Sequence, residues 1–473
     1  MEKLITLESA LNQLPPVRRL DDFYAQDFPL YQKLVVLDDD PTGTQTVNGV
    51  YVYTVWDEES LTAALSEKGH IFFILTNSRG LSAADSRAQH QEIIRNLTAA
   101  SKRTGVPFMV ISRSDSTLRG HYPMETEVLR AGLEEIGTKI DGEIIAPFFL
   151  EGGRYTIGDV HYVKEGDVLV PAGQTEFAKD TTFGYRSSDL KDWVREKNPD
   201  MPFGEAIHSV SIHMLRTAQI EEITGVLKRA GNFEKIIVNA ACYEDMEVFV
   251  QALYGAIAAG KNYLFRTAAG FVRVFAKIAM RPLLTGAELT TGSELGGLVI
   301  VGSHVKKTTQ QLEGLLELEK AVPIEFDVNV LDESDEAVDE SIDDAVENIR
   351  RAIVDKKTAV VYTSRKVVRK TEENSEANLR FSVRVSESLV QMVRRLPQMP
   401  SFIVAKGGIT SSDIGVKGLG AKKALVLGQV LPGVPVWQLG PESKYPGVSY
   451  VVFPGNVGDE NGLRDVVYSA QKG

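Results

Sequence analysis

The sequence lacks several features that define whole classes of protein. Cys242 is the only cysteine, which excludes an intrachain disulfide and a cysteine-based zinc site. The histidines are scattered and none forms a His-x-x-x-His pair beside a carboxylate, so we expect no dedicated transition-metal site. No apolar run approaches the roughly 18 residues of a membrane helix, and no basic region with an apolar core opens the chain. We therefore expect a cytoplasmic protein without a membrane partner.

A basic surface is also missing. The formal net charge is -12, and no local stripe of lysine and arginine interrupts the acidic balance. Such a chain repels a long nucleic acid, so we expect no nucleic-acid partner. Small anions remain compatible, because a few arginines can build a positive pocket inside an acidic protein. The hydrophobic share of 43% and the charged share of 25% are ordinary for a globular protein and exclude a disordered tail, a collagen and a coiled coil.

Short β-branched runs alternate with amphipathic stretches along the chain. The runs are continuously apolar, which is typical of strands covered on both faces in a parallel sheet. Predicted strands lie at 34–37, 71–75, 108–111, 235–238, 298–301, 359–362 and 402–405, and predicted helices at 86–103, 216–230, 305–319 and 376–396. This repetition predicts an α/β fold with right-handed crossovers.

The turn-rich stretch 281–297 separates two blocks, each large enough for its own core. We predict two three-layer α/β domains with mainly parallel sheets, residues 1–290 and 291–473, and an active-site cleft between them. Residues 1–28, which contain two adjacent prolines, are predicted to form an appended arm.

Ligands of open parallel sheets bind beyond the carboxyl ends of the strands. The first predicted strand is followed by Asp38, Asp39 and Asp40 and then by a Pro-Thr-Gly turn that contains Thr42. One interpretation is a capped turn with solvated acids. The other is a functional cluster whose carboxylates accept hydrogen bonds from substrate hydroxyls, supply a general base or hold Mg²⁺. The sequence favours the two interpretations about equally.

Arginines follow other predicted strands. Arg79 comes after the strand at 71–75, Asp115 and Arg119 come after the strand at 108–111, and Arg154 ends the stretch 146–154. Arginine beside small hydroxyl residues suits the bidentate capture of a carboxylate or a phosphate. Any one of them alone is more simply explained as a surface arginine paired with a neighbouring acid. Together with the aspartates, they favour an anion-binding site.

The second half of the chain carries glycine loops after its predicted strands, at 302–303, 407–408 and 455–458. Glycine lets backbone N–H groups approach phosphate oxygens closely. A single loop of this kind is weak evidence, but three in one domain favour a nucleotide site. The near-match to a P-loop at 255–262 has Asn262 where Ser or Thr must hold Mg²⁺, and it ends an amphipathic helix, so Gly260 is predicted to be its C-cap. No Gly-x-Gly-x-x-Gly follows a strand, which disfavours a dinucleotide dehydrogenase.

With these motifs the chain resembles the four-carbon acid sugar kinase family, from about Lys33 to near the C-terminus. The matching segments are 39–43, 115–120, 146–154, 302–303, 407–411 and 455–456, of which the first two are the more specific. The resemblance implies an N-terminal domain that binds a sugar acid and a C-terminal domain that binds ATP. It also implies phosphoryl transfer to a terminal hydroxyl of a substrate such as threonate, erythronate or 3-oxo-tetronate.

The resemblance and the strand-end loops together mark the candidate site residues. The catalytic candidates are Asp39, Asp40 and Asp115. The substrate-binding candidates are Asp39, Asp40, Thr42, Arg79, Asp115, Arg119 and Arg154. The nucleotide-binding candidates are Gly302, Ser303, Gly407, Gly408, Ile409, Thr410, Gly455 and Asn456. The implied cofactors are ATP and Mg²⁺, with the metal bridging the ATP phosphates.

Phosphoryl transfer asks the protein mainly for positioning and charge neutralisation. We expect the substrate carboxylate to pair with Arg119, helped by Arg79 or Arg154, while one of the three candidate aspartates takes the proton. Two other functions stay open: a non-catalytic sugar-acid binding protein, and an Mg-dependent phosphatase that uses the cluster from Asp38 to Asp40. Neither explains the glycine loops of the second half. The oligomeric state is also left open, a homo-oligomer included.

Overall fold

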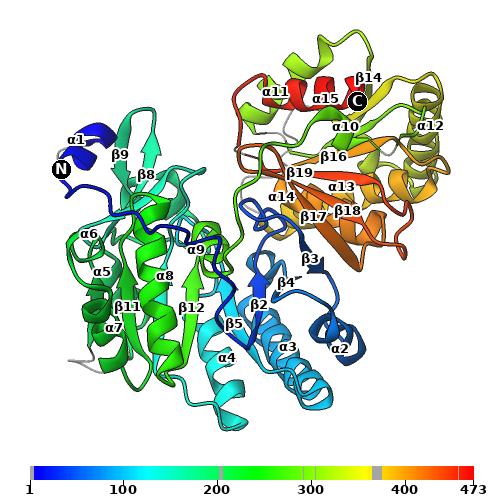
Figure 1. Cartoon of the computed structure of the whole chain (residues 1–473). Helices are drawn as coiled ribbons and strands as arrows, with labels where there is room; N and C mark the ends of the chain where they lie inside the picture. The colour runs from blue at the N-terminus through cyan, green and yellow to red at the C-terminus, as the bar shows by residue number, and fades with distance from the viewer. Residues whose placement is uncertain (1–4, 202–205, 291, 304, 365–374, 456) are drawn as a thin grey trace. The chain divides into compact units, whose positions relative to one another are not determined.

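The computed structural model of the chain (Figure 1) describes residues 5–201, 206–290, 292–303, 305–364, 375–455 and 457–473. Two compact units make up the chain. The first contains Met1–Gly43 and Val55–Met280, and the second contains Thr44–Thr54 and Arg281–Gly473. The second unit therefore includes a short excursion from the N-terminal part of the sequence, a feature that the sequence analysis does not anticipate.

The first unit is built on a parallel sheet with strand order β10-β11-β6-β12-β5-β2-β4. The bounds are β2 (Lys33–Asp38), β4 (Ile71–Leu75), β5 (Phe108–Arg113), β6 (Gly142–Ala146), β10 (Ile207–Val210), β11 (Glu234–Val238) and β12 (Tyr263–Thr267). β2, β4 and β6 are buried along their whole length. This confirms that the continuous apolar runs are strands covered on both faces.

Two groups of helices pack on this sheet. One contains α2 (Glu58–Ser66), α3 (Ala83–Thr104) and α4 (Met124–Glu135), and the other contains α6 (Ile212–Thr217), α7 (Ile220–Arg229), α8 (Tyr243–Ala258) and α9 (Ala269–Phe275). The predicted helix at 216–230 is therefore wrong in its extent, because Gln219 begins a new helix after the C-cap Ala218. Gly260, with φ of 91°, directly follows the C-cap of α8, as expected for the end of a helix rather than a P-loop.

A small antiparallel sheet with strand order β1-β9-β8-β7 is a second feature of the first unit. It consists of β1 (Ile5–Thr6), β7 (Arg154–Ile157), β8 (Val160–Glu165) and β9 (Val168–Pro171). These short strands escape a search for long apolar runs. The N-terminal segment adds β1 to this sheet, and α1 (Leu7–Asn12) follows; further along, the buried Phe23 packs into the unit. The predicted arm is thus part of the folded first unit.

The sheet of the second unit has strand order β3-β17-β18-β19-β16-β13-β15-β14. Its strands are β3 (Val50–Tyr53), β13 (Leu298–Val301), β14 (Ala321–Phe326), β15 (Thr358–Thr363), β16 (Phe402–Lys406), β17 (Lys423–Leu431), β18 (Val434–Leu439) and β19 (Ser449–Phe453). The strands from β19 to β14 are parallel, whereas β3, β17 and β18 are antiparallel. A mainly parallel α/β unit with an antiparallel edge results.

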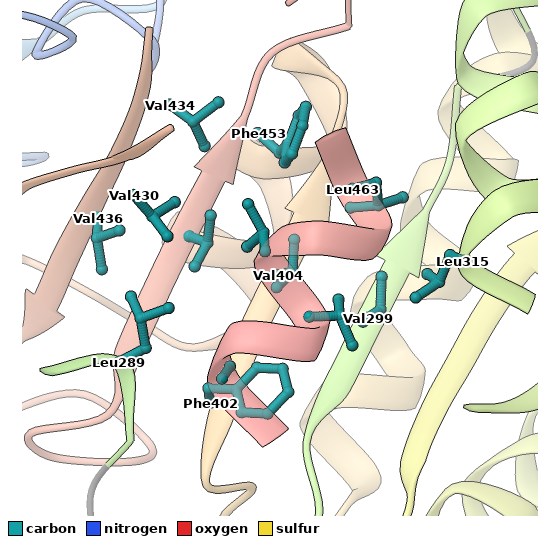
Figure 2. Packing of buried hydrophobic residues seen from close by; sticks show 14 of the residues in the cluster. Leu289, Val299, Leu315, Phe402, Val404, Val430, Val434, Val436, Phe453 and Leu463 are labelled. Carbon is teal, nitrogen blue, oxygen red and sulfur yellow. The ribbon is translucent and has the colours of Figure 1, made fainter. Parts of the chain in front are cut away.

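The core of the second unit lies between this sheet and several helices (Figure 2). Val299, Val404 and Phe453 come from the parallel strands, and Leu315 and Leu463 come from α11 (Lys306–Leu316) and α15 (Gly462–Lys472). The remaining helices are α10 (Gly286–Leu289), α12 (Asp335–Val354), α13 (Ser375–Arg395) and α14 (Gly408–Asp413). With these elements in place, all seven predicted strands of the chain are confirmed.

Candidate functional site

The aspartate run lies at the carboxyl end of β2. Asp38 ends the strand, is 2% exposed and forms an ion pair with Arg113 at 3.1 Å. Asp39 accepts a hydrogen bond of 3.2 Å from the backbone N–H of Asp115. A Cβ at Gly43 would lie 1.8 Å from Asp38 Oδ2, so only glycine fits there. The Pro-Thr-Gly turn thus closes tightly over the first carboxylate.

Asp40 is the most exposed of the clustered aspartates, at 18%, and it is held from two sides. Thr42 donates its backbone N–H to Asp40 Oδ1 at 2.8 Å, and the Thr42 hydroxyl donates to the same oxygen. Arg79 pairs with the other oxygen of Asp40 and, through Nη1, with Asp115 Oδ1 at 3.2 Å. Arg79 lies in a 3₁₀ turn directly after β4. The loops after β2 and β4 are therefore tied together by charge.

The loop after β5 completes this network. Arg119 Nε donates to Asp115 Oδ2 at 2.7 Å, and Arg119 Nη1 lies 3.7 Å from Asp180. Arg119 and Arg154 both lie over the ring of Phe177, at 5.1 Å and 5.4 Å from its centroid. The structure thus brings together all the substrate-binding residues that the sequence predicts, and it places two guanidinium groups on one aromatic ring.

Side chains from other elements hold the backbone of the loop after β5. His161 Nε2 donates to the carbonyl of Ser116 at 2.7 Å. The Tyr185 hydroxyl donates to the carbonyl of Thr117 at 2.7 Å. Arg266 Nη2 donates to the carbonyl of Arg119 at 2.7 Å. These three hydrogen bonds hold the loop after β5 in one conformation, as a candidate binding loop needs.

Sequence reasoning missed these supporting residues. Arg266 offers a signal that could have found it, because it is a charged side chain inside the buried strand β12. Phe177 and Asp180 lie near short 3₁₀ turns in a loop without periodicity, and nothing in the sequence predicts that they approach Arg119.

The electrostatics divide the aspartates into two pairs. Burial raises the pKa of Asp38 to about 7, although Arg113 opposes the effect, and burial also raises the pKa of Asp39. Burial alone would raise the pKa of Asp40 and Asp115 too. Arg79 is the strongest opposing influence at both groups, and it acts together with hydrogen bonds from Thr42 at Asp40 and from Arg119 and Thr117 at Asp115. The combined effect holds both pKa values below the ordinary range. The pKa values of Asp40 and Asp115 are thus lowered, and those of Asp38 and Asp39 are raised.

The predicted nucleotide-binding residues that the structure describes gather at the carboxyl ends of β13, β16 and β19, which are neighbours in the sheet. A Cβ at Gly302 would lie 2.3 Å from Thr410 Oγ1, so the loops after β13 and β16 touch. Gly407 has φ of 113°, and a Cβ there would lie 3.3 Å from Cβ of Ser303. Both positions need glycine, one for space and the other for its backbone conformation.

The helix α14 begins in this loop at Gly408. The N–H groups of Gly408, Ile409 and Thr410 belong to its first turn, where helices offer no internal acceptor. Ile409 is an apolar side chain with 77% of its surface exposed. The N–H of Gly407 is engaged, because it donates to the carbonyl of Phe453 at 2.8 Å. The amides that remain for a phosphate are therefore those after Gly407.

The third loop follows β19. Apart from its neighbours in the chain, no heavy atom of the described residues lies within 4 Å of a Cβ at Gly455. Gln311 donates to the carbonyls of Val457 and Asp459 at 3.1 Å and 2.6 Å and fixes the end of the loop. Asn456, predicted to bind the nucleotide, lies outside the described residues.

Two further searches cover only the described residues. In that part of the chain, no group of three or more His, Cys, Asp or Glu is arranged to hold a metal ion. No helix there is both long and apolar enough to cross a membrane.

Comparisons with known proteins agree with the two-unit architecture. Residues 34–275 match the sugar-binding N-terminal domain, and residues 298–463 match the nucleotide-binding C-terminal domain. No curated protein matches the chain.

Two solved structures share the fold across nearly the whole chain. A Salmonella typhimurium LT2 protein provisionally described as a tRNA synthase has a TM-score of 0.65 at 15% identity, covering 93% of this chain and 99% of that one. A Haemophilus influenzae protein of the DUF1537 family has a TM-score of 0.60 at 18% identity, covering 92% and 99%. The two solved structures show only the fold, whereas the two domain matches show the family. The chain belongs to the four-carbon acid sugar kinase (DUF1537) family, in which a sugar-binding N-terminal domain is joined to a nucleotide-binding C-terminal domain.

Proposed function

We propose that the protein is an ATP-dependent kinase that phosphorylates the terminal hydroxyl of a four-carbon acid sugar, of the threonate, erythronate or 3-oxo-tetronate type. One observation carries the proposal: Arg79, Asp115 and Arg119, from loops after neighbouring strands, converge with Asp40 in the unit that matches a sugar-binding domain. The glycine loops of the other unit, which matches a nucleotide-binding domain, supply the second half of the reaction.

The carboxylate of the acid binds Arg119 and Arg154. Burial lowers the pKa of Arg154, and the nearby Arg119 acts in the same direction. An anion between two guanidinium groups relieves this repulsion and accepts charge-assisted hydrogen bonds from both. Phe177 beneath both side chains holds them side by side.

A substrate hydroxyl binds Asp40, the most accessible carboxylate of the cluster, and Asp40 takes its proton. Arg79 and Thr42 fix the orientation of this carboxylate. Its low pKa keeps the carboxylate ionised and able to accept a hydrogen bond from the hydroxyl, and the loose transition state of phosphoryl transfer requires positioning more than a strong base. Asp39 and Asp115 support the loop from which it projects.

The nucleotide phosphates bind the amides of Gly408, Ile409 and Thr410, beside Gly302, Ser303 and Gly455. Mg²⁺, when bound, supplies charge neutralisation at the phosphates. This ion keeps several waters and binds substrate phosphates rather than an all-protein cage. That preference fits a chain whose described residues contain no cluster of three or more acidic or histidine ligands.

The test is ADP release from ATP with a panel of four-carbon acid sugars and the matching uncharged tetritols. We expect turnover with at least one acid and none with the tetritols. Arg119→Met should raise KM for the acid roughly 10- to 100-fold, because a hydrogen bond to a charged group contributes about 1.5–3 kcal/mol. Arg130→Met, which removes a partly exposed pair with Glu134, should change neither kcat nor KM. Absence of ADP release with every acid would contradict the proposal.

A phosphatase that uses the aspartate run is less well supported. Its nucleophile would need to be exposed and ionised, whereas Asp38 is buried beneath Gly43, pairs with Arg113 and has its pKa raised to about 7. Phosphate release from p-nitrophenyl phosphate, abolished by Asp38→Asn, would favour it instead. A non-catalytic sugar-acid binding protein would bind the acid, show no thermal stabilisation by ATP and release no ADP.

A further inference from the structure

The last residue of β16, Lys406, is a lysine with no exposed surface. Its ammonium donates hydrogen bonds to the carbonyls of Pro454 and Gly455 at 2.5 Å and 3.1 Å, and it lies 4.4 Å from the ring centroid of Phe453. The side chain therefore reaches from the strand before one glycine loop to the backbone of the next. Sequence reasoning assigned it no role.

The bond to Pro454 orients the loop. In a planar trans peptide the C=O and the following N–H point in opposite directions. Because the carbonyl of Pro454 points at the ammonium, the N–H of Gly455 points away from it. Lys406 thus orients the N–H of Gly455, a residue of the predicted nucleotide site, away from its own ammonium group.

The charge of Lys406 is not balanced by an acid. Within the described part of the chain it has no carboxylate partner, and Lys307, at the start of α11, adds a like charge. β13 carries no ionisable side chain, and Tyr450 of β19 bonds a backbone carbonyl of α14. Asp413 of α14 pairs with Lys417 at 2.8 Å. A buried cation of this kind is costly unless a negative charge comes close.

We propose that Lys406 is a positioning residue of the nucleotide site, which fixes the loop at Gly455 and supplies from behind it the positive charge that the nucleotide phosphates neutralise. The inference rests on the proposed function, because it requires the phosphates to bind at these loops. It adds that nucleotide binding and protonation of this lysine are coupled.

The direction of the coupling follows from the burial. Burial, with a smaller contribution from Lys307, lowers the pKa of Lys406 to about 7. Phosphates bind the charged form more tightly and so raise this pKa. Above pH 7, binding therefore takes up a proton, and nucleotide affinity falls as pH rises through 7. If only the ammonium form binds well, affinity at pH 8 is about tenfold weaker than at pH 6.

Lys33 offers a matched control. It is also a buried lysine of a parallel strand, it donates to three backbone carbonyls, of Ala64, Leu65 and Glu67, at 2.7–3.1 Å, and it lies over Phe72. It differs in standing at the amino end of β2, away from the ligand-binding ends of the strands. Lys33→Met removes the same kind of group without touching a predicted site.

The experiment is calorimetric titration of the full-length protein with MgATP from pH 6 to pH 8.5, in buffers of different ionisation enthalpy. We expect wild type and Lys33→Met to take up a proton and to lose affinity about tenfold from pH 6 to pH 8. Lys406→Met should bind more weakly at pH 6 and lose the part of the pH dependence due to this lysine. Lys406→Arg should retain binding and be insensitive to pH, because arginine stays charged. Ionisation of the nucleotide is common to all variants and cancels in the comparison.

Binding by the wild type with the same pH dependence as Lys406→Met would overturn the inference and leave the kinase proposal standing. No binding of MgATP at any pH would remove both. Because the wild-type proton uptake is measured without any substitution, a Lys406→Met protein that does not fold still leaves the inference open to refutation.

Discussion

The two candidate sites handle charge in opposite ways. In the first unit, charged groups meet partners of opposite sign: Arg79 pairs with Asp40 and Asp115, and Arg113 lies beside Asp38 and Asp39. In the second unit, the strand-end loops present backbone amides, and among the described residues the buried ammonium of Lys406 has no carboxylate partner. In the first arrangement most charges are balanced by neighbouring side chains, although Asp39 Oδ1 and Nε of Arg154 are buried without a hydrogen-bond partner within the described ranges. In the second, the proposed function has an anion balance the charge.

The difference fits the two ligands of the proposed function. A small polyhydroxy acid carries one charge and several hydroxyls, so its site needs fixed donors and acceptors at set positions. A triphosphate carries several charges on one flexible chain, so amides and a diffuse positive potential suffice to hold it. Variants that remove a charge from the first site should therefore differ in their effects on stability and turnover from variants in the second site.

The largest effect is expected for Arg113→Met. It leaves Asp38 buried without its ion-pair partner and removes one of the cations that act on Asp39, and breaking a buried pair typically costs about 3–5 kcal/mol. Arg395→Met removes a partly exposed arginine that pairs with Asp339 and Asp343, and should cost at most about 1 kcal/mol. Urea unfolding followed by tryptophan fluorescence measures both. Equal losses of stability in the two variants would mean that the Arg113 pairs contribute no more than an exposed ion pair.

Next in size is the effect of Asp40→Asn on turnover. The amide keeps the shape of the side chain but cannot take a proton, so kcat should fall by about a hundredfold or more. The affinity for MgATP should stay unchanged, since Asp40 belongs to the other unit. Asp339→Asn, on the exposed surface of α12, is the control. Turnover of Asp40→Asn near the wild-type level would remove Asp40 from the role of proton acceptor.

Much of the candidate site in the first unit could be predicted from one rule applied to the sequence. Parallel strands bring their carboxyl ends to the same edge of a sheet, so Asp40, Arg79 and Arg119 could be predicted to meet from the residues after three apolar runs. The same rule placed Gly302 and Gly407 together, because β13 and β16 are neighbours. Strand periodicity and strand ends are local properties, which is why a single sequence reveals them.

What escaped prediction depends on contacts that are distant in sequence. Phe177 reaches Arg119 and Arg154 from an irregular loop. β3 joins the second unit from position 50 by pairing with β17, whose alternating pattern is weaker than a continuous apolar run. The burial of Lys406 depends on where the carbonyls of the loop after β19 lie. Local pattern carries no information on any of these.

A smaller loss of stability is expected at Gly43, which is tightly packed, and almost none at Gly455, which has open space around it. Gly43→Ala forces a methyl group against the buried carboxylate of Asp38, and overpacking of this kind costs about 1–3 kcal/mol. Beyond its chain neighbours, Gly455→Ala meets no heavy atom of the described residues within 4 Å, so its stability should change by less than about 0.5 kcal/mol. The alanine keeps its backbone N–H, but its methyl group hinders the close approach of a phosphate to this amide, so the same variant should raise KM for ATP. Equal stability of the two alanine variants would show that the turn over Asp38 adapts freely.

The last effect is the dependence of stability on pH, which tests the buried ammonium of the second unit. The folded state lowers the pKa of Lys406 to about 7 from an unfolded value near 10.4, so between these limits the unfolded chain binds more protons. Stability from this group is fully present above about pH 10 and is lost as pH falls towards 7. Without ligand, the urea midpoint of the second unit should therefore rise from pH 7 to pH 9 relative to Lys406→Met. Saturating MgATP should flatten that difference, since the phosphates hold the proton on the ammonium, and a slope indifferent to MgATP would separate the lysine from the nucleotide.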